Sequence, residues 1–325
     1  MPLKLTSFID SFSYSVIQLF SYSVIQSFSY SFMHRSGFVN IIGNPNVGKS
    51  TLMNALTGER LSVVTSKAQT TRHRIMGIVS GDEYQIVFSD TPGIIKPKYK
   101  MQAGMMDFVR SAFTDADVMV YVTDVVETAD KNSAYIEKIS GLDIPVLVVI
   151  NKIDLTTPEK LDLLSDVWRN FLPAAIIIPV SAKEKFNIET LSNAIRNSLP
   201  EGPAYYPKDE MTDKPERFFV SEILRGKIFE NYEKEIPYCS EVVVESFKDE
   251  PSILRIQTLI FVERDTQKAI LIGKKGAAMK KTATEARKEM EHFFGKKIFL
   301  ETFVKVRKDW RNDENYLKNL GYLNN

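Results

Sequence analysis

The sequence comprises 325 residues and carries 42 Lys+Arg, 41 Asp+Glu and a formal net charge of +1. A hydrophobic fraction of 44% and a charged fraction of 26% are typical of soluble globular proteins and exclude a wholly disordered chain, and the length favours about two domains. The single cysteine, Cys239, excludes an internal disulfide and fits a reducing compartment, whereas the balanced total charge can hide an uneven distribution.

The N-terminal stretch contains an exact short repeat. Residues 12–18 and 20–26 both read FSYSVIQ, and residues 28–32 begin a third copy. The stretch lacks the basic start and apolar run of a signal peptide, and its hydroxyl and amide groups would need partners in a membrane. Its alternation of Ser with aromatic residues is also typical of aggregating strands. We expect residues 1–32 to be a low-complexity extension, either a start-site artefact ahead of Met33 or a disordered tail.

A phosphate-binding loop follows the first predicted strand. Residues 37–42 are apolar and β-branched, and they run into GNPNVGKS, which has the G-x-x-x-x-G-K-S pattern. Its glycines let backbone N–H groups point at phosphate oxygens. Lys49 can neutralise β- and γ-phosphate charge, Ser50 can bind Mg²⁺, and a helix predicted over residues 51–56 directs its positive end at the phosphates. The predicted nucleotide-binding residues here are Gly43, Asn44, Pro45, Asn46, Val47, Gly48, Lys49, Ser50 and Thr51.

A mobile switch is predicted next. Residues 69–72 read QTTR within a polar, weakly periodic stretch. A threonine there can complete the Mg²⁺ shell, with Thr71 as the first choice and Thr70 as the second. An ordinary surface turn is the alternative.

A second switch follows the strand predicted over residues 85–89. Asp90 can hold Mg²⁺ through water, and the Gly93 N–H can bind the γ-phosphate, so loss of that phosphate would release the loop. Ras-type GTPases have a water-orienting glutamine after this motif, but Ile94 cannot hydrogen-bond to water. The nucleotide-binding residues expected here are Asp90, Thr91, Pro92, Gly93 and Ile94.

Another group must therefore position the attacking water, and slow intrinsic turnover is expected. Asn46 can help to hold a K⁺ ion near the phosphates, where it would supply the charge stabilisation of an arginine finger. The alternative is that Asn46 only braces the loop. The residues expected to act in catalysis are Lys49, Thr71, Gly93 and Asn46.

Guanine specificity is predicted from NKID, which follows an apolar strand over residues 146–150. Ligands bind at the carboxyl ends of such strands. Asp154 can accept hydrogen bonds from guanine N1–H and the 2-amino group, and adenine offers neither donor. Asn151 can contact the base and tie this loop to the phosphate loop, the Lys152 stem can lie over the purine, and backbone N–H groups after the strand at residues 175–180 can meet guanine O6. The predicted residues are Asn151, Lys152, Ile153, Asp154, Val180, Ser181 and Ala182.

The proline-rich residues 199–215 read as a linker, and a second domain follows. Its predicted elements have the order αββααβ: a helix at 216–229, strands at 241–247 and 252–262, helices at 266–272 and 277–294, and a strand at 297–306. The expected domain bounds are 33–199 for a GTP-binding domain, 200–215 for the linker and 216–325 for a KH-like RNA-binding domain.

A Gly-x-x-Gly turn lies between the two last predicted helices. Such loops clamp about four nucleotides of single-stranded RNA in KH domains, although a solvated turn is the alternative. From Arg264 to Arg311 there are 14 Lys+Arg and 6 Asp+Glu, a local net charge of +8, which fits a phosphate-binding surface. Leu271 and its two neighbours can line a groove for bases or belong to the core. The expected RNA-binding residues are Gly273, Lys274, Lys275, Gly276, Lys280, Lys281, Ile270 and Ile272, with Lys305, Arg307, Lys308 and Arg311 extending the patch or remaining solvated.

The motifs from about residue 37 to 325 resemble those of the Era family of bacterial GTPases. GNPNVGKST, KAQTTRHRIMG, DTPG, NKID and VSA are similar to its nucleotide motifs, and IGKKG and VKVRKDWR to its KH signature. The resemblance implies an α/β P-loop GTPase domain with a mostly parallel sheet, followed by an α+β type II KH domain. It also implies binding to the 3′ end of small-subunit ribosomal RNA, assistance in small-subunit assembly, and a cytoplasmic location with some peripheral inner-membrane association. No counterpart is expected for residues 1–32.

Three functions are compatible with these features. The first is a switch that uses GTP/GDP, Mg²⁺ and possible K⁺ stimulation to act on pre-ribosomal RNA. A GTPase of tRNA modification would carry a folate or substrate domain in place of the KH-like end. A passive RNA-binding module whose first domain only binds GDP is disfavoured by the complete motifs. Because no sustained heptads are present, a monomer is the default expectation.

Overall fold

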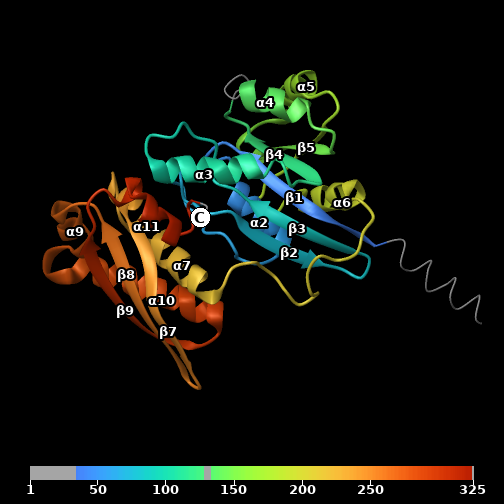
Figure 1. Ribbon diagram of the computed structural model, residues 1–325. Helices are drawn as coiled ribbons and strands as arrows, with labels where there is room; N and C mark the ends of the chain where they lie inside the picture. Colours follow the sequence, from blue (N-terminus) through green and yellow to red (C-terminus); the bar gives the residue numbers. More distant parts are fainter. Residues whose placement is uncertain (1–33, 128–132, 324–325) are drawn as a thin grey trace, which may run out of the picture.

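The structure is a computed structural model that describes residues 34–127 and 133–323. The expectation for residues 1–32 therefore lies outside the described residues. Two sheets with their helices lie side by side, and the chain passes from the first to the second through residues 199–215 (Figure 1). No helix in the described part of the chain is long and apolar enough to cross a membrane.

The first sheet has the strand order β2-β3-β1-β4-β5-β6, and every neighbouring pair is parallel except β2 and β3. This confirms the predicted α/β fold with a mostly parallel sheet. The strands are β1 (Arg35–Gly43), β2 (Ile75–Ser80), β3 (Tyr84–Asp90), β4 (Val118–Asp124), β5 (Val146–Asn151) and β6 (Ile176–Pro179). Their central residues are apolar almost without interruption, because both faces of the sheet are covered.

Helices cover the two faces of this sheet. One face packs against α2 (Lys49–Thr57) and α6 (Ile188–Ser198), with Leu52 and Ile195 in the core. The other packs against α3 (Lys100–Ser111), α4 (Ser133–Ser140) and α5 (Pro158–Phe171), with Met105 and Trp168 in the core. The carboxyl ends of β1, β3, β4 and β5 meet at one edge because these strands are parallel, and β1 lies between β3 and β4, where the chain changes direction across the sheet.

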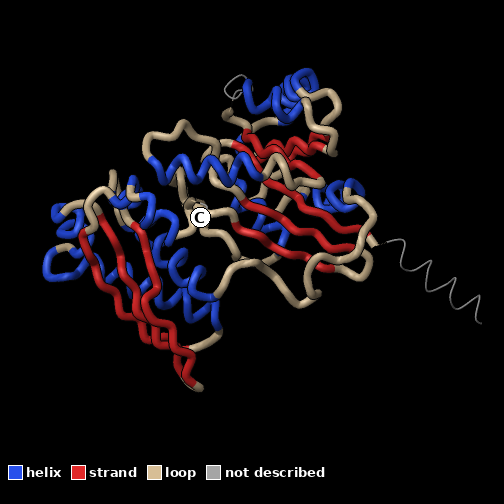
Figure 2. The backbone as a smooth tube through the Cα atoms, viewed as in Figure 1, coloured by secondary structure: helices blue, strands red, loops and turns tan. Residues whose placement is uncertain are grey.

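The second sheet has the order β7-β8-β9, with β7 (Glu241–Glu250) antiparallel to β8 (Ile253–Val262) and β9 (Lys297–Val306) parallel to it. Figure 2 shows helices packed on one face of these strands. The helices are α7 (Glu216–Asn231), the short α8 (Ile236–Cys239), α9 (Asp265–Ile272) and α10 (Ala277–Phe294). Apart from α8, the element order is the predicted αββααβ. The core includes Leu224, Ile260 and Met290.

The predicted linker is held against the first sheet. Its Tyr205 and Tyr206 N–H groups donate to Gln85 Oε1 at 2.7 and 2.9 Å, and the Ile78 N–H donates to the Met211 carbonyl at 2.9 Å. The prolines prevent regular structure here, but backbone hydrogen bonds still fix the path of the segment.

The last residues return to the junction of the two units. After β9 the chain forms a 3-10 turn, η4 (Trp310–Asn312), and then α11 (Glu314–Asn319), which lies between the two sheets in Figure 1. Trp310 Nε1 donates to the Cys239 carbonyl at 3.0 Å. A Cβ on Gly104 of α3 would lie 2.2 Å from the Tyr322 carbonyl oxygen. The glycine therefore lets the backbone of α3 lie in close contact with the backbone near the end of the chain.

Candidate nucleotide-binding site

Five segments that are far apart in the sequence line one cavity of about 660 Å³ at the carboxyl edge of the first sheet. Sequence-predicted residues on its wall are Pro45, Asn46, Gly48, Lys49, Ser50, Thr51, Thr71, Gly93, Asn151, Lys152, Asp154 and Ser181. Others lie behind the wall: Val47, Ile94, Val180 and Ala182 are buried in the two cores. Leu155 and Lys183 also line the cavity and were not predicted.

The phosphate loop has the backbone that its glycines permit. Gly43 has φ +150° and Gly48 has φ +96°, and a Cβ on Gly48 would lie 2.2 Å from Asn151 Nδ2. Lys49 is buried, and its Nζ donates to the Asn44 carbonyl at 2.8 Å. Burial lowers the pKa of Lys49 to about 8, although the negative charges of Asp90 and Glu127 act to raise it. A phosphate chain beside this ammonium would raise that pKa again and be neutralised by it.

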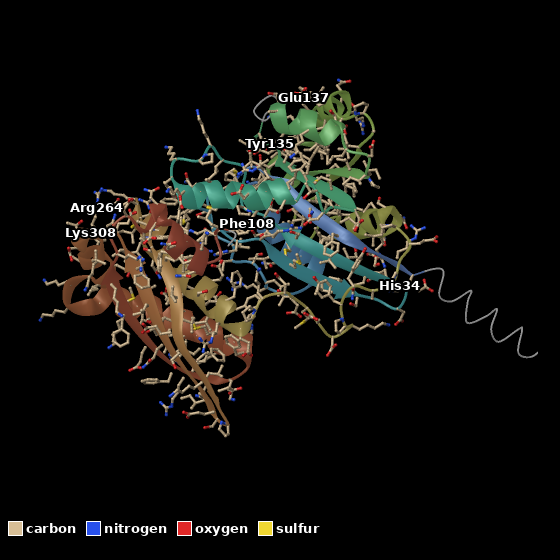
Figure 3. The ribbon with its side chains drawn as sticks, viewed as in Figure 1. His34, Phe108, Tyr135, Glu137, Arg264 and Lys308 are labelled. Atoms are coloured by element: carbon tan, nitrogen blue, oxygen red, sulfur yellow. The ribbon has the colours of Figure 1, made fainter. Side chains whose placement is uncertain are left out.

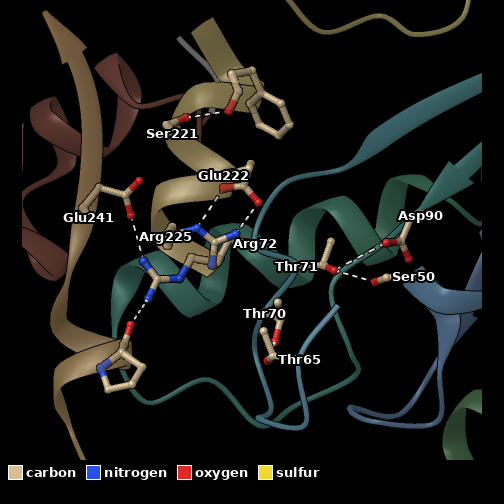
Figure 4. A network of polar contacts seen from close by, with 12 residues as sticks. Ser50, Thr65, Thr70, Thr71, Arg72, Asp90, Ser221, Glu222, Arg225 and Glu241 are labelled. Carbon is tan, nitrogen blue, oxygen red and sulfur yellow. Dashed lines mark hydrogen bonds and ion pairs between the residues drawn. The ribbon is translucent and has the colours of Figure 1, made fainter. Parts of the chain in front are cut away.

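Three oxygen-bearing side chains meet beside the phosphate loop. Ser50 Oγ and Thr71 Oγ1 are 2.8 Å apart, and Thr71 Oγ1 donates to Asp90 Oδ2 at 3.4 Å (Figure 4). Asp90 Oδ1 is buried and has no hydrogen-bond partner in the part of the chain that the structure describes. Burial raises the pKa of Asp90, and a cation would lower it. These hard oxygens fit Mg²⁺. Thr70 instead bonds to Thr65 and the Lys67 carbonyl.

No group of three or more Asp, Glu, His or Cys side chains among residues 34–127 and 133–323 could hold a metal. A magnesium ion at this place would therefore also need phosphate oxygens, which is how proteins usually bind it together with a nucleotide.

The NKID segment is braced from three directions. Asn151 Nδ2 donates to the Val47 carbonyl at 2.8 Å, and the Ala182 N–H donates to Asn151 Oδ1 at 3.0 Å. The predicted tie to the phosphate loop is present and uses Asn151 Nδ2, whereas Asn151 Oδ1 accepts from the segment after β6. Ser181 Oγ donates to Asp154 Oδ1 at 2.6 Å, which holds the exposed carboxylate at the cavity.

The Asp-x-x-Gly segment packs directly on the phosphate loop. The Ile94 N–H donates to the Gly43 carbonyl at 3.1 Å, and a Cβ on Gly93 would lie 2.7 Å from the Pro45 backbone. The Ile94 side chain is buried in the core beside α3 and offers no polar group to water. Asn46 has φ +67°, is exposed at the cavity, and makes no side-chain hydrogen bond with any residue that the structure describes.

The Gly-x-x-Gly turn lies far from this cavity, between α9 and α10. Gly273 and Gly276 have φ +74° and +77°. Lys274, Lys275 and Lys280 are exposed and form no ion pair within the described part of the chain, and Lys281 reaches Glu285 only at 3.9 Å. Ile270 is 52% exposed, Ile272 is partly buried and Leu271 belongs to the core, so one apolar side chain of the three is freely presented.

Comparisons with known proteins agree with this arrangement. A family model described as "50S ribosome-binding GTPase" matches residues 38–152, and one described as "KH domain" matches residues 235–311. The chain is 46% identical to "GTPase ERA-like, chloroplastic" of Oryza sativa, covering 89% of this chain and 70% of the relative. It is 41% identical to "GTPase Era" of Staphylococcus epidermidis, covering 89% and 98%.

The chain belongs to the Era family of GTPases. Among solved structures it is similar, at a TM-score of 0.85 and 38% identity over 89% of this chain and 99% of the other, to Era in complex with MgGDPNP and nucleotides 1506–1542 of 16S ribosomal RNA. It matches a single-substitution variant of Aquifex aeolicus Era bound to GDP and AlF4⁻ at the same TM-score and 37% identity, again over 89% and 99%. Membership in this family makes the chain a GTPase with a C-terminal KH domain.

The expected extension of the basic patch stays a prediction for this Era-family chain, but three of its four cations also contact carboxylates. Lys305 lies 3.8 Å from Glu245, Arg307 is 2.7 Å from Asp313, and Arg311 pairs with Glu263. These cations have internal carboxylate partners, so only Lys308 of the four stays without an ion pair in the described structure. Figure 3 shows Lys308 beside Arg264, at the end of the KH unit. Sequence counting missed this because the partners come from other strands and from the chain end.

Residues that sequence reasoning missed lie beside the cavity and at the junction of the two units. Asp124 accepts from Lys152 Nζ at 2.7 Å, and its place at the carboxyl end of β4 was the available signal. Lys67 and Arg72 bond to the KH unit. The segment predicted as a mobile switch is thus fastened to the second domain, and no local pattern could indicate that.

Proposed function

We propose that this Era-family GTPase is a GTP-driven switch that binds the 3′ end of small-subunit ribosomal RNA and assists assembly of the small ribosomal subunit. The observation that carries the proposal is the presence, on one chain, of a GTPase cavity and a Gly-x-x-Gly turn whose lysines form no ion pair among the described residues. An Era structure that is similar to 89% of this chain is in complex with nucleotides 1506–1542 of 16S ribosomal RNA. The "50S ribosome-binding" description belongs to a family model that matches only residues 38–152.

Cross-linking the protein to RNA in cells and sequencing the attached RNA tests the partner. Reads concentrated at the 3′ end of 16S RNA are expected. Reads from large-subunit RNA or from tRNA would contradict the proposal and favour a different ribosomal or tRNA-modifying role.

The proposal assigns roles to the site. Lys49 neutralises phosphate charge, Ser50, Thr71 and Asp90 hold Mg²⁺, and Asp154 recognises guanine. Lys49, Ser50, Thr71 and Asp154 line one cavity, and the buried Asp90 accepts a hydrogen bond from Thr71, which supports these roles. Bound Mg²⁺ would neutralise charge on the phosphate oxygens. Lys49→Ala is expected to lose nucleotide binding in a fluorescent-GDP titration, and wild-type affinity would contradict the assignment.

A potassium role for Asn46 is a finer part of the proposal. Ile94 is buried and apolar and cannot orient the attacking water. The Asn46 side chain is exposed and makes no hydrogen bond among the described residues, so it is available to bind an ion rather than brace the loop. GTP turnover is expected to be faster in KCl than in NaCl at equal ionic strength, and the difference should vanish in Asn46→Ala. Equal wild-type rates in the two salts would exclude the potassium role.

The domain bounds 33–199, 200–215 and 216–325 also belong to the proposal. So do a monomeric state, which is the default expectation without sustained heptads, and a cytoplasmic location with some peripheral association with the inner membrane, which the family resemblance implies. Analytical ultracentrifugation tests the monomeric state. Probing membrane fractions for the protein before and after a salt wash tests the peripheral association. Absence from unwashed membrane fractions would remove the membrane part and leave the RNA role intact.

A further inference from the structure

The segment of residues 67–73, which contains the switch predicted at residues 69–72, is fastened to the KH unit at Lys67. Lys67 Nζ donates to the Phe229 carbonyl at 2.7 Å and to the Tyr232 carbonyl at 2.6 Å, where α7 ends. Those carbonyls are unsatisfied within the helix, and a lysine ammonium is a suitable donor for them.

A second anchor lies five residues on, at Arg72. Its Nη1 donates to the Ser240 carbonyl and to Glu241 Oε2, each at 2.8 Å, and its Nη2 donates to the Pro237 carbonyl at 2.9 Å. The three acceptors lie close together in the chain, from Pro237 in α8 to Glu241 at the start of β7. The side chain is 1% exposed. A planar guanidinium suits such a set of divergent acceptors, and a lysine ammonium cannot reproduce its fork.

The chain end completes this buried cluster. Tyr322 Oη donates to Glu241 Oε2 at 2.9 Å, the same oxygen that receives Arg72. The Tyr322 ring stacks on His73, with centroids 4.3 Å apart. One residue of the tail thus contacts both the acceptor of Arg72 and the residue that follows Arg72.

Thr71 and Arg72 are adjacent in the chain, but their side chains contact different units of the protein. Figure 4 shows Thr71 directed toward Ser50 and Asp90, and Arg72 directed toward Glu241. Because the two share a peptide bond and the Arg72 side chain is held by three acceptors, the backbone that carries the Thr71 hydroxyl is restrained as well.

We propose that Arg72 is a positioning residue for GTP hydrolysis, which holds Thr71 beside Ser50 and Asp90 by bonding to residues 237–241 of the KH domain. The inference rests on the proposed role of Thr71. If Arg72 acts in this way, the nucleotide site is complete only when the KH domain and the chain end are docked on the switch. Any partner that moves the KH domain then moves a group of the hydrolytic site.

The test uses the full chain with Arg72→Met, and Arg74→Met as the matched control. Arg74 is also a buried arginine of the same stretch, but its partners Asn40, Ser89 and Asp115 all lie in the first unit. Thermal unfolding followed by circular dichroism confirms that both variants fold.

For Arg72→Met we expect kcat to fall about tenfold or more, because a displaced group can cost up to ~10² in rate. Two readouts other than rate should change with it, and a third should stay the same. The Mg²⁺ concentration that half-saturates GDPNP binding should rise several-fold, GDP affinity should stay within about twofold because the switches respond to the γ-phosphate, and hydrogen exchange at residues 67–73 should accelerate. Arg72→Lys should restore part of each change.

Each outcome decides the matter. A folded Arg72→Met protein with wild-type rate and Mg²⁺ dependence overturns the inference, as does an equal loss in Arg74→Met, which would indicate a general packing effect. Thr71→Ala distinguishes failure of the proposed role of Thr71 from failure of the inference about Arg72. If Thr71→Ala behaves as wild type, the proposed role of Thr71 fails. If Thr71→Ala is impaired while Arg72→Met is not, only the inference fails. Should Arg72→Met not fold, Tyr322→Phe, which removes one hydroxyl, decides by the same readouts.

Discussion

Individual residues in this protein are constrained by contacts that the motifs alone describe only in part. The G-x-x-x-x-G-K-S pattern and NKID are local, so the sequence predicts both loops and even the tie between them. Only the structure shows that Gly48 makes the tie possible, since any side chain there would collide with Asn151. Asp124 and Arg72 escaped prediction because a single charged residue has no local signature of its distant partner.

Gly48→Ala is expected to weaken nucleotide binding at least about tenfold, because the added Cβ would lie 2.2 Å from Asn151 Nδ2 at φ +96°. The new methyl group would displace Asn151 and open the bond to Val47. Fluorescent-GDP titration measures the effect.

Gly58→Ala is the matched control, since Gly58 also has a positive φ, +77°, but nothing lies within 4 Å of its Cβ position. It should lower stability by about 1 kcal/mol and leave GDP affinity unchanged. Equal affinity losses in the two variants would show that backbone strain, and not the collision, weakens binding.

Cys239 is expected to resist alkylation in the native protein. Burial raises the pKa of its thiol to about 11, and the thiolate is the reactive form. At pH 8 only about 0.1% of such a thiol is ionised, and the fraction rises about tenfold per pH unit below the pKa. Iodoacetamide labelling followed by mass spectrometry should be slow at pH 8, faster at pH 9 and fast in urea. Labelling at pH 8 as rapid as in urea would contradict a buried thiol.

Secondary-structure elements were predicted best where periodicity and end signals agree. The helix Ala277–Phe294 and the strand Lys297–Val306 have the predicted bounds, since Gly276 and Gly295 stand just outside the helix with positive φ. The antiparallel β2 and the central β4 were not assigned, because neither carries a recognised motif. The short α8 was also missed, since four residues show no period.

The two lysines of the Gly-x-x-Gly turn allow a quantitative prediction of how RNA binding depends on salt. Lys274 and Lys275 are exposed and without ion pairs among the described residues. If each contacts one phosphate, Lys274→Ala with Lys275→Ala should reduce the slope of log K against log salt by about 1.4 for single-stranded RNA. Binding to a 16S 3′-end oligonucleotide at several salt concentrations measures it.

A double substitution elsewhere provides the charge-matched control. Lys160→Ala with Lys208→Ala removes the same two charges from exposed positions outside the KH unit. This control should leave the salt slope within error of wild type. An equal loss of slope in both proteins would mean that overall charge, and not the turn, attracts the RNA.

At the scale of the whole molecule, the two units meet through buried polar groups. Arg72, Arg225, Glu222, Glu241 and Tyr322 are almost fully buried at the junction, and Arg225 pairs with Glu222 within α7. Such a network is costly when half of it is lost, because unpaired charges then stay buried. The sequence could not predict this arrangement, since its members come from the switch, α7, β7 and the chain end.

This junction predicts reciprocal coupling between nucleotide and RNA. If GDPNP raises affinity for a 16S 3′-end oligonucleotide over that with GDP by a factor, the oligonucleotide must raise the GDPNP-over-GDP preference by the same factor, about 5–150-fold in typical cases. The two factors come from RNA titrations in each nucleotide and nucleotide titrations with and without RNA. Arg72→Met should bring both factors toward one while leaving RNA affinity in GDP unchanged, because the Gly-x-x-Gly turn is intact. Factors that stay at their wild-type values in a folded Arg72→Met protein would show that the coupling runs through other contacts between the two units.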